Sequence, residues 1–335
     1  MKISTIGIFK SEYNMAILIT GCAGFIGSNL VDFYLQRGEE VIGIDNLSTG
    51  QLANIQAHLQ NKRFTFYQSN LLDWKEMESV VSYCEVIFHL AAMVGMFNIL
   101  EKPIATLEVN MGTTESLLTA ISKLQRKPVI LLASSSEVYG SKREPMRETD
   151  PLIIECSYKI HASYPISKLC NEVAGMAYFQ EMQVPVVVMR LFNTVGRRQS
   201  SRYGMVLPRF IKQAMSNEPI TIFGDGTQTR AFCDIRDTCN ILYALSTSTQ
   251  SVGEIINVGS EQSTTILELA ELVKALTHSK STFHFETLHD SYGDGYINTQ
   301  HRKPDLSKLQ SIIPYRHQWS LEATIKDMIE ASSAL

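Results

Sequence analysis

ILITGCAGFIG, at residues 17–27, joins an apolar run to a turn that holds three glycines, Gly21, Gly24 and Gly27. Residues 28–37 then continue with helical spacing. A strand, a glycine turn and a helix N-terminus present unpaired backbone N–H groups and the positive end of a helix dipole to a phosphate. Because glycines also serve ordinary tight turns, the triplet alone is only weak support for a dinucleotide site.

Further short apolar runs, rich in leucine or β-branched residues, lie at residues 41–44, 86–90, 129–132 and 186–189. Such runs are typical of strands buried on both faces of a parallel sheet. Helical spacing separates them, and one helical stretch opens at Pro103, a residue favoured at the first helical position. The alternation predicts an α/β fold with a doubly wound (Rossmann) parallel sheet, whose ligand crevice lies at the carboxyl ends of the strands.

The pattern becomes irregular after Asn193, and GEIINVG at residues 253–259 supplies one more strand-like run. We therefore expect a second, smaller lobe whose chain crosses back to the sheet. The predicted division is an N-terminal extension (1–15), a Rossmann domain (16–193, joined by 231–258) and a substrate-binding lobe (194–230 and 259–335).

Composition excludes several classes of protein. A chain of 335 residues with 44% apolar composition can bury a large core, and its net charge of −4 comes without any run of like charge. We therefore expect neither disorder nor nucleic-acid binding. No apolar run reaches the roughly 18 residues of a membrane span, so we expect no membrane association. The six cysteines are scattered without C-x-x-C spacing, which predicts a cytoplasmic protein. The histidines lack the spacing of metal ligands, so we expect no metal site.

Asp45 ends the second predicted strand, close to the roughly 20-residue interval at which an acidic residue meets the adenosine ribose. A carboxylate accepts a hydrogen bond from the ribose 2′-hydroxyl and repels a 2′-phosphate. The position therefore favours NAD over NADP as cofactor. Taken alone, Asp45 is explained equally well as a turn residue before Asn46.

Tyr164 and Lys168 lie four positions apart, so both project from one face of a helix, and Pro165 fits only the first turn of that helix. A tyrosine has a pKa of about 10, so a basic role near neutrality needs a fall of roughly 3 units, or about 4 kcal/mol. Lys168 and an oxidised nicotinamide are the expected sources of the positive charge. In a random sequence, a Y-x-x-x-K spacing is most often an accident on an ordinary helix surface. After a glycine turn of this kind, a catalytic pair is the better explanation.

The G-x-x-G-x-x-G spacing resembles the fingerprint of the extended short-chain dehydrogenase/reductases, the NAD-dependent epimerase/dehydratase family. Further landmarks occur in order along the chain: HLAA (89–92), NMGT (110–113), SSSEVYG (134–140), YPISK (164–168), LFNTVG (191–196), GDGTQTRAFCDIRD (224–237) and HRKPD (301–305). The resemblance covers nearly the whole chain. One departure is Asn70, where the family usually has an aspartate near the adenine; an asparagine can still hydrogen-bond.

The resemblance implies a set of ligand-binding residues. Those expected at NAD are Gly21, Gly24, Phe25, Ile26, Gly27, Asp45, Asn46, Asn70, Leu71, Leu90, Ala91, Ala92, Asn110, Tyr164 and Lys168. Ser135 and Tyr164 would remove the proton of the sugar C4 hydroxyl while hydride passes to NAD. Arg230 would pair with the nucleotide diphosphate of a sugar nucleotide, a task suited to a planar donor fork, and Asn193 would lie beside that substrate.

The members of this family differ in the step that they carry out on the 4-keto sugar. Sugar 4,6-dehydratases carry Asp-Glu after the catalytic Ser or Thr, whereas Ser136 and Glu137 stand here, so dehydration is disfavoured. Ser135-Ser136-Glu137 with Arg302 resembles UDP-glucuronate decarboxylases. The segment that holds Arg302 also occurs widely in 4-epimerases, where this arginine would bind the nucleotide end of the substrate. LFNTVG, RYGMVLPRF (202–210) and residues 292–305 look epimerase-like.

We therefore expect reversible 4-epimerisation of a UDP-hexose or UDP-hexuronate, with decarboxylation of UDP-glucuronate as the alternative and Glu137 and Ser136 among the catalytic residues. An inactive NAD-binding scaffold is less expected, because Ser135, Tyr164 and Lys168 are all present. The resemblance also implies a homodimer in which residues 103–124 and 164–181 pair across a twofold axis.

Overall fold

The computed structural model describes residues 15–142, 145–154, 157, 160–202, 204–287 and 299–333. Almost all of the expected N-terminal extension, and much of the stretch 292–305, therefore lies outside the described residues. Within the described part of the chain, no helix has the length and apolarity needed to cross a membrane.

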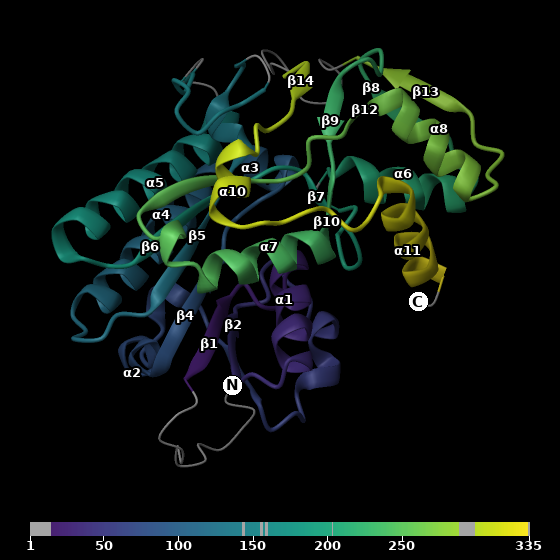
Figure 1. The fold of residues 1–335 in the computed structure, drawn as a ribbon. Coiled ribbons are helices and arrows are strands. Elements are labelled where there is room, and N and C mark those ends of the chain that lie inside the picture. Colours follow the sequence, from purple (N-terminus) through teal and green to yellow (C-terminus); the bar gives the residue numbers. More distant parts are fainter. Residues whose placement is uncertain are drawn as a thin grey trace.

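A seven-stranded parallel sheet forms the centre of the molecule, in the order β3-β2-β1-β4-β5-β6-β11 (Figure 1). The strands are β1 Ala16–Thr20, β2 Val41–Asp45, β3 Phe64–Gln68, β4 Cys84–His89, β5 Val129–Ser135, β6 Val186–Leu191 and β11 Glu254–Val258. This order is that of a doubly wound fold, so the predicted fold class is confirmed. β3 was not predicted, because an edge strand with alternating burial has no continuous apolar run.

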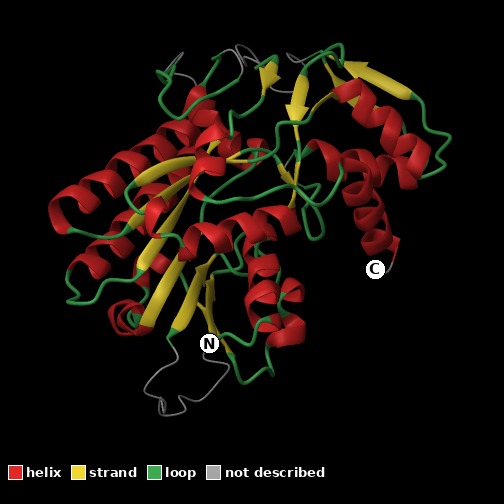
Figure 2. Cartoon of the chain, viewed as in Figure 1, coloured by secondary structure: helices red, strands yellow, loops and turns green. Residues whose placement is uncertain are grey.

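Helices cover both faces of this sheet, as Figures 1 and 2 show. α1 (Phe25–Gln36) and α7 (Ile235–Thr247) pack on one face through residues such as Leu30 and Leu242. α2 (Met77–Tyr83), α4 (Pro103–Ser122) and α5 (Ser163–Met182) cover the other through residues such as Val81 and Leu117. Shorter elements are α3 Met96–Glu101 and the 3-10 turns η1 Leu52–Asn54, η2 Gln56–His58, η3 Leu71–Asp73, η4 Ser136–Tyr139, η5 Ile160–Ala162 and η6 Thr249–Ser251.

A separate hydrophobic core holds the smaller lobe, built from α6 (Val206–Met215), α8 (Ile266–Leu276) and α11 (Leu321–Ser333). Its short sheets comprise β7 Thr194–Val195 with β10 Cys233–Asp234, β8 Ile220–Phe223 with β13 Phe283–Glu286, and β12 Ser263–Thr265 with β9 Thr229–Ala231 and β14 His301–Arg302. α10 (Ser307–Ile312) was expected in this lobe, yet it contributes Leu309 to the core on the α1 face of the sheet. The lobe limits thus differ from expectation at this helix, because apolar spacing does not say against which core a helix packs.

Candidate active site

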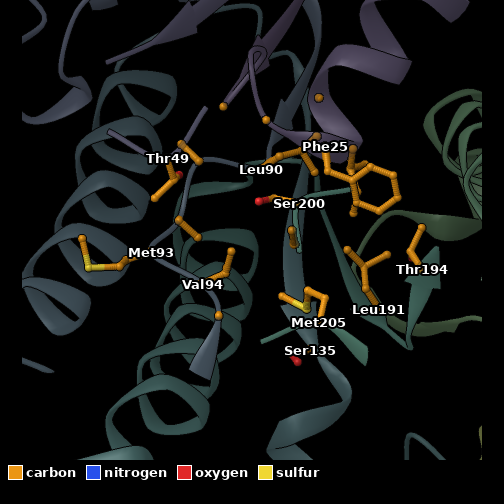
Figure 3. A pocket seen from close by; sticks show the side chains of 18 of the residues that line it. Phe25, Thr49, Leu90, Met93, Val94, Ser135, Leu191, Thr194, Ser200 and Met205 are labelled. Carbon is orange, nitrogen blue, oxygen red and sulfur yellow. The ribbon is translucent and has the colours of Figure 1, made fainter. Parts of the chain in front are cut away.

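A cavity of about 570 Å³ opens at the carboxyl ends of the strands, between the sheet and the smaller lobe. Figure 3 shows side chains from both parts around this space, among them Phe25, Leu90 and Met205. The structure brings together on its wall these predicted site residues: Gly21, Gly24, Phe25, Ile26, Gly27, Asp45, Asn46, Asn70, Leu71, Leu90, Ala91, Ala92, Ser135, Glu137, Tyr164, Lys168, Asn193, Arg230 and Arg302.

Glycine is required at two positions of the first turn. Gly21 has a φ of +70°, and a Cβ there would lie 2.9 Å from the backbone nitrogen of Ala91. A Cβ on Gly27 would lie 2.2 Å from the carbonyl oxygen of Gly21. The turn is therefore pressed against the 90–92 segment on one side and against its own helix on the other. This leaves the N-terminus of α1 open toward the cavity, where a pyrophosphate can be bound.

The carboxylate of Asp45 braces this turn from the end of β2. One oxygen accepts a hydrogen bond from the Ala23 N–H at 2.9 Å, and the other accepts from the Leu47 N–H at 2.8 Å. Burial raises the pKa of Asp45, and these two bonds oppose the rise. Each oxygen keeps a further lone pair for a ribose hydroxyl, so the structural role and the expected cofactor role are compatible.

Asn46 and Asn70 follow the ends of β2 and β3 on the cavity wall. The side-chain oxygen of Asn46 accepts from the Ser48 N–H at 3.0 Å, and that of Asn70 accepts from the Leu72 N–H at 3.2 Å. Both amides thus shape the turn after their strand. Leu71 is buried beside them and supplies an apolar wall for a flat ring.

Two predicted site residues do not line the cavity. Asn110 is 1% exposed and its side chain bonds Met93, accepting from the backbone N–H at 2.7 Å and donating to the carbonyl at 3.3 Å. Ser136 is 3% exposed, behind the wall that its neighbours Ser135 and Glu137 form. In this structure neither side chain is placed to touch a ligand, because each lies beneath the cavity wall.

Tyr164 lies in the first turn of α5, with Pro165 directly after it, as expected. Its hydroxyl lies near the side chain of Ser135, at the end of β5. Burial raises the pKa of Tyr164 to about 12; the Ser135 hydroxyl and the charge of Arg302 oppose the rise, and the charge of Glu137 adds to it. The protein's own groups therefore hold this phenol neutral at pH 7.

Lys168 does not act on Tyr164 in the expected way. Its ammonium group donates to the Ala133 carbonyl at 2.8 Å and lies 6.0 Å from the centre of the Tyr164 ring. Burial lowers the pKa of Lys168 to about 8, and the Glu172 carboxylate counteracts this. The lowering of the Tyr164 pKa that the sequence led us to expect from Lys168 is not seen, because this helix turn directs the ammonium toward the strand.

Glu137 and Arg302 form a two-pronged ion pair on the cavity wall. One Arg302 nitrogen bonds the Glu137 Oε1 atom, and the other lies 3.2 Å from Oε2. Burial alone would raise the pKa of Glu137, but Arg302, with help from the charges of Arg230 and His161, holds it below its ordinary value. Glu137 is therefore ionised at neutral pH. Arg230 lies opposite Arg302 on the adjacent parallel strand, so two guanidinium groups share this carboxylate region.

Several wall residues were not found from the sequence. Arg198 donates to the Ser28 carbonyl at 3.0 Å and pairs with Asp32 at 2.8 Å, both on α1, and has an unusual backbone φ of +70°. His161 precedes α5, and Met205 caps α6. Their wall positions depend on contacts between segments far apart in the chain, such as the 170-residue separation of Arg198 and Ser28. No local pattern marks Arg198 or His161, whereas Met205 lies within RYGMVLPRF, a stretch noted in the sequence without a site role.

The cavity has an excess of positive charge among the lining residues that the structure describes. Four cationic side chains face two carboxylates; the cations are Lys168, Arg198, Arg230 and Arg302, and the carboxylates are Asp45 and Glu137. Such a balance suits ligands that carry phosphates. Within the described parts of the chain, no group of three or more metal-binding side chains occurs.

Comparison with known proteins identifies the relatives of the chain. Residues 17–259 match the NAD dependent epimerase/dehydratase family. A UDP-N-acetyl-alpha-D-glucosaminuronate decarboxylase of Bacillus cytotoxicus is 34% identical over 93% of this chain and 96% of its own. UDP-glucuronic acid decarboxylase 1 of Danio rerio is 33% identical over 94% of this chain and 72% of its own.

Among solved structures, UDP-glucuronic acid 4-epimerase from Bacillus cereus, in complex with UDP-glucuronic acid and NAD, superposes with a TM-score of 0.86. It is 28% identical, and the match covers 96% of this chain and 99% of that one. The glycine turn and the Asp45 carboxylate fit NAD, and the expected cofactor is confirmed. The chain thus belongs to the NAD-dependent epimerase/dehydratase family and, like its relatives, is an NAD-dependent enzyme of nucleotide-sugar chemistry.

Proposed function

We propose that the enzyme decarboxylates a UDP-linked hexuronate through a 4-keto intermediate, with 4-epimerisation as the second candidate. The observation that carries this proposal is the Glu137–Arg302 ion pair beside the Ser135–Tyr164 hydroxyl pair. The sequence alone led us to expect epimerisation first. The position of this ion pair, together with the two decarboxylase relatives, changes the order.

Oxidation at C4 turns a hexuronate into a β-keto acid, because the C4 ketone and the C6 carboxylate then flank C5. The glycine turn, Asp45 and Lys168 would hold NAD, which would supply the hydride acceptor for C4 and the hydride donor at the end of the cycle. When carbon dioxide leaves, the electron pair of the C5–C6 bond moves into an enolate with its charge on O4, and a proton then adds to C5. A site for this chemistry needs groups that stabilise charge at O4.

Ser135 and Tyr164 are the groups suited to contact O4, because both line the cavity and their hydroxyls lie near each other at the strand end. The charges of Glu137 and Arg302 both influence the pKa of the Tyr164 phenol, so both groups lie near it. A sugar whose O4 contacts this phenol would therefore place its C4, C5 and C6 atoms near both charges. Arg302 can stabilise the enolate, whereas the ionised Glu137 disfavours a second carboxylate nearby and so favours loss of neutral carbon dioxide. Epimerisation of a neutral hexose needs neither effect.

Epimerisation keeps support from the similarity to the Bacillus cereus 4-epimerase over 96% of the chain. In that reaction the keto sugar turns its other face to the cofactor, and Tyr164 returns the proton to O4. The C5–C6 bond must then be protected from cleavage. Glu137 and Arg302 would serve such an enzyme only by binding the substrate.

The test is incubation with UDP-glucuronate, UDP-N-acetylglucosaminuronate, UDP-galacturonate, UDP-glucose and UDP-N-acetylglucosamine, with products identified by NMR and carbon dioxide measured separately. We expect a UDP-pentose, or its acetamido analogue, with an equal amount of carbon dioxide from a uronate. A product inverted at C4 with all its carbons retained would overturn decarboxylation and establish the second candidate. No reaction with any of the five would contradict both.

We also infer that the enzyme forms a homodimer through α4 and α5. These helices pack against each other and still expose apolar side chains, namely Ile104, Met111, Val173 and Met182. Exposed apolar residues gathered on one helix pair are typical of an interface, and a twofold axis would bury them against their own copies.

A further inference from the structure

His89 ends β4 and is 4% exposed, yet it does not line the cavity. Its imidazole lies between two buried threonines of different elements. Nδ1 is 2.9 Å from the hydroxyl of Thr20 on β1, and Nε2 is 3.0 Å from that of Thr114 on α4. The proposed decarboxylation gives this histidine no role.

The direction of each hydrogen bond is decided by counting protons at Thr20. Its hydroxyl oxygen accepts from the backbone N–H groups of Leu90 and Ala91, each at 3.1 Å. A hydroxyl has two lone pairs and one proton, so both lone pairs are used and the proton must point to Nδ1 of His89. Nδ1 is therefore an acceptor, and the ring proton lies on Nε2.

The other side of the ring agrees with this assignment. The hydroxyl of Thr114 donates to the Asn110 carbonyl at 3.0 Å, which leaves its oxygen free to accept from the Nε2–H of His89. Burial, with a smaller contribution from the charge of Lys168, lowers the pKa of His89 to about 3, so the ring is neutral at pH 7. Nε2 also lies 3.5 Å from the hydroxyl of Thr113, whose own proton is donated to the Val109 carbonyl at 2.6 Å, so this oxygen too can only accept from the ring.

The chain of bonds ends at two parts of the active site. Thr20 holds the N–H groups of Leu90 and Ala91, which line the cavity (Figure 3 labels Leu90). At the other end, the Asn110 side chain holds Met93 and donates to Ser167 at 3.0 Å; Ser167 in turn donates to the Tyr164 carbonyl at 2.7 Å. β1, β4, α4 and the first turn of α5 are therefore joined through one imidazole.

We propose that His89 is a positioning residue, whose neutral ring, protonated on Nε2, locks the 90–93 wall of the cofactor site to α4 and through it to α5. Its effect on NAD binding is independent of which reaction the enzyme performs. Only its effect on turnover rests on the proposed role of Tyr164.

The tautomer is tested on the wild-type protein labelled with 15N-histidine, with the His89 signals assigned by their loss in His89→Asn. We expect the nitrogen shifts of a neutral ring protonated on Nε2 at pH 7. A ring protonated on Nδ1, or a charged ring, would overturn the proposal. The tautomer itself is read from the wild-type spectrum, and the variant serves only to assign the signals.

The positioning role is tested by calorimetric titration with NAD, without turnover, so failure of the reaction assignment leaves it intact. Asn can replace the Nδ1 acceptor, whereas Gln reaches only toward Thr114. We expect His89→Gln, which loses the acceptor for Thr20, to weaken NAD binding about tenfold. His89→Asn and Thr114→Val, which each break the bond to α4 and leave Thr20 in place, should weaken it about fivefold, and wild-type affinity in both would overturn the link to α4. Thr20→Val should also weaken NAD binding about tenfold. The double variant Thr20→Val with His89→Gln should bind NAD as well as Thr20→Val alone does, because both substitutions remove the same contact.

Two further outcomes would contradict this role. One is wild-type affinity for NAD in His89→Gln. The other is additive losses in the double variant that parallel the loss of thermal stability, because a residue with a general structural role would behave in that way.

Discussion

The cofactor half and the substrate half of the cavity are built in different ways. On the cofactor side, short segments at strand ends meet through the backbone: Asp45 binds the N–H groups of Ala23 and Leu47, and Gly21 packs on Ala91. On the substrate side, the decisive contact is a side-chain ion pair whose members, Glu137 and Arg302, are 165 residues apart. The first half can therefore stay constant in a family while the second changes the reaction.

Because the two halves are built differently, substitutions on the cofactor side should change the affinity for NAD and leave the product unchanged. Substitutions at the ion pair should change the rate and the nature of the product and leave the affinity for NAD unchanged. Tyr164 lies where the two halves meet, so it should matter most.

Tyr164→Phe should lower turnover by about 10²- to 10⁴-fold with any substrate, because it removes the group that exchanges the O4 proton. The affinity for NAD should change little, since the ring remains. Initial rates by NMR and calorimetric titration with NAD measure the two effects. Turnover within threefold of wild type would remove Tyr164 from the mechanism.

The same variant allows a test by pH. The protein raises the pKa of Tyr164 to about 12, so the phenol is neutral below that pH unless positive charge is brought near it. Binding of NAD⁺ should lower this pKa and move ionisation toward neutral pH. The phenolate absorbance of wild type minus that of Tyr164→Phe, titrated with and without NAD⁺, measures the shift. An unchanged or higher pKa with NAD⁺ would contradict it.

Glu137→Gln should lower carbon dioxide release by roughly 100-fold, because it removes one charge of the pair and leaves Arg302 without its carboxylate partner. Its affinity for NAD should stay within threefold of wild type. Glu181→Gln, a similar change on the exposed end of α5, is the matched control. A C4-inverted product from Glu137→Gln would indicate that the pair directs the 4-keto sugar toward carbon loss.

Asp45→Asn should weaken NAD binding by about tenfold and narrow the preference for NAD over NADP. Asn has one acceptor oxygen in place of two, so one of the bonds to Ala23 and Leu47 is lost, and the negative charge that repels a 2′-phosphate disappears. Asp73→Asn, on an exposed site, is the control. Equal or tighter binding of NADP by the wild type would contradict the cofactor preference.

Val173→Glu should have the smallest effect on the cavity, because this side chain is 63% exposed on α5. We expect the dissociation constant of the dimer to rise at least about tenfold, since a charge would be buried at the twofold axis. Phe285→Glu, an exposed apolar site in the smaller lobe, should leave assembly unchanged. Light scattering over a range of concentrations measures both, and a wild type that is only monomeric would contradict the homodimer.

The sequence predicted the two halves of the cavity unequally. The glycines of ILITGCAGFIG, Asp45 at the end of the second strand and the Tyr164–Lys168 pair belong to local patterns, and these residues lie on the cavity wall. Asn110 was also expected there, but its helix directs the amide to Met93. The direction of Lys168 toward Ala133 was likewise not evident, because spacing of four on a helix specifies a face and not a contact.

Sequence alone determined the fold class and the cofactor, because apolar periodicity and a glycine turn act over a few residues, and it determined the family, because short landmarks occur in order along the chain. Tertiary structure alone decided which charges meet. The pairing of Glu137 with Arg302, the placement of Arg230 opposite Arg302 and the link from Thr20 through His89 to Thr114 join separate strands and helices. Such contacts depend on how parallel strands and their helices are brought together in space, and no local pattern in the chain encodes that distance.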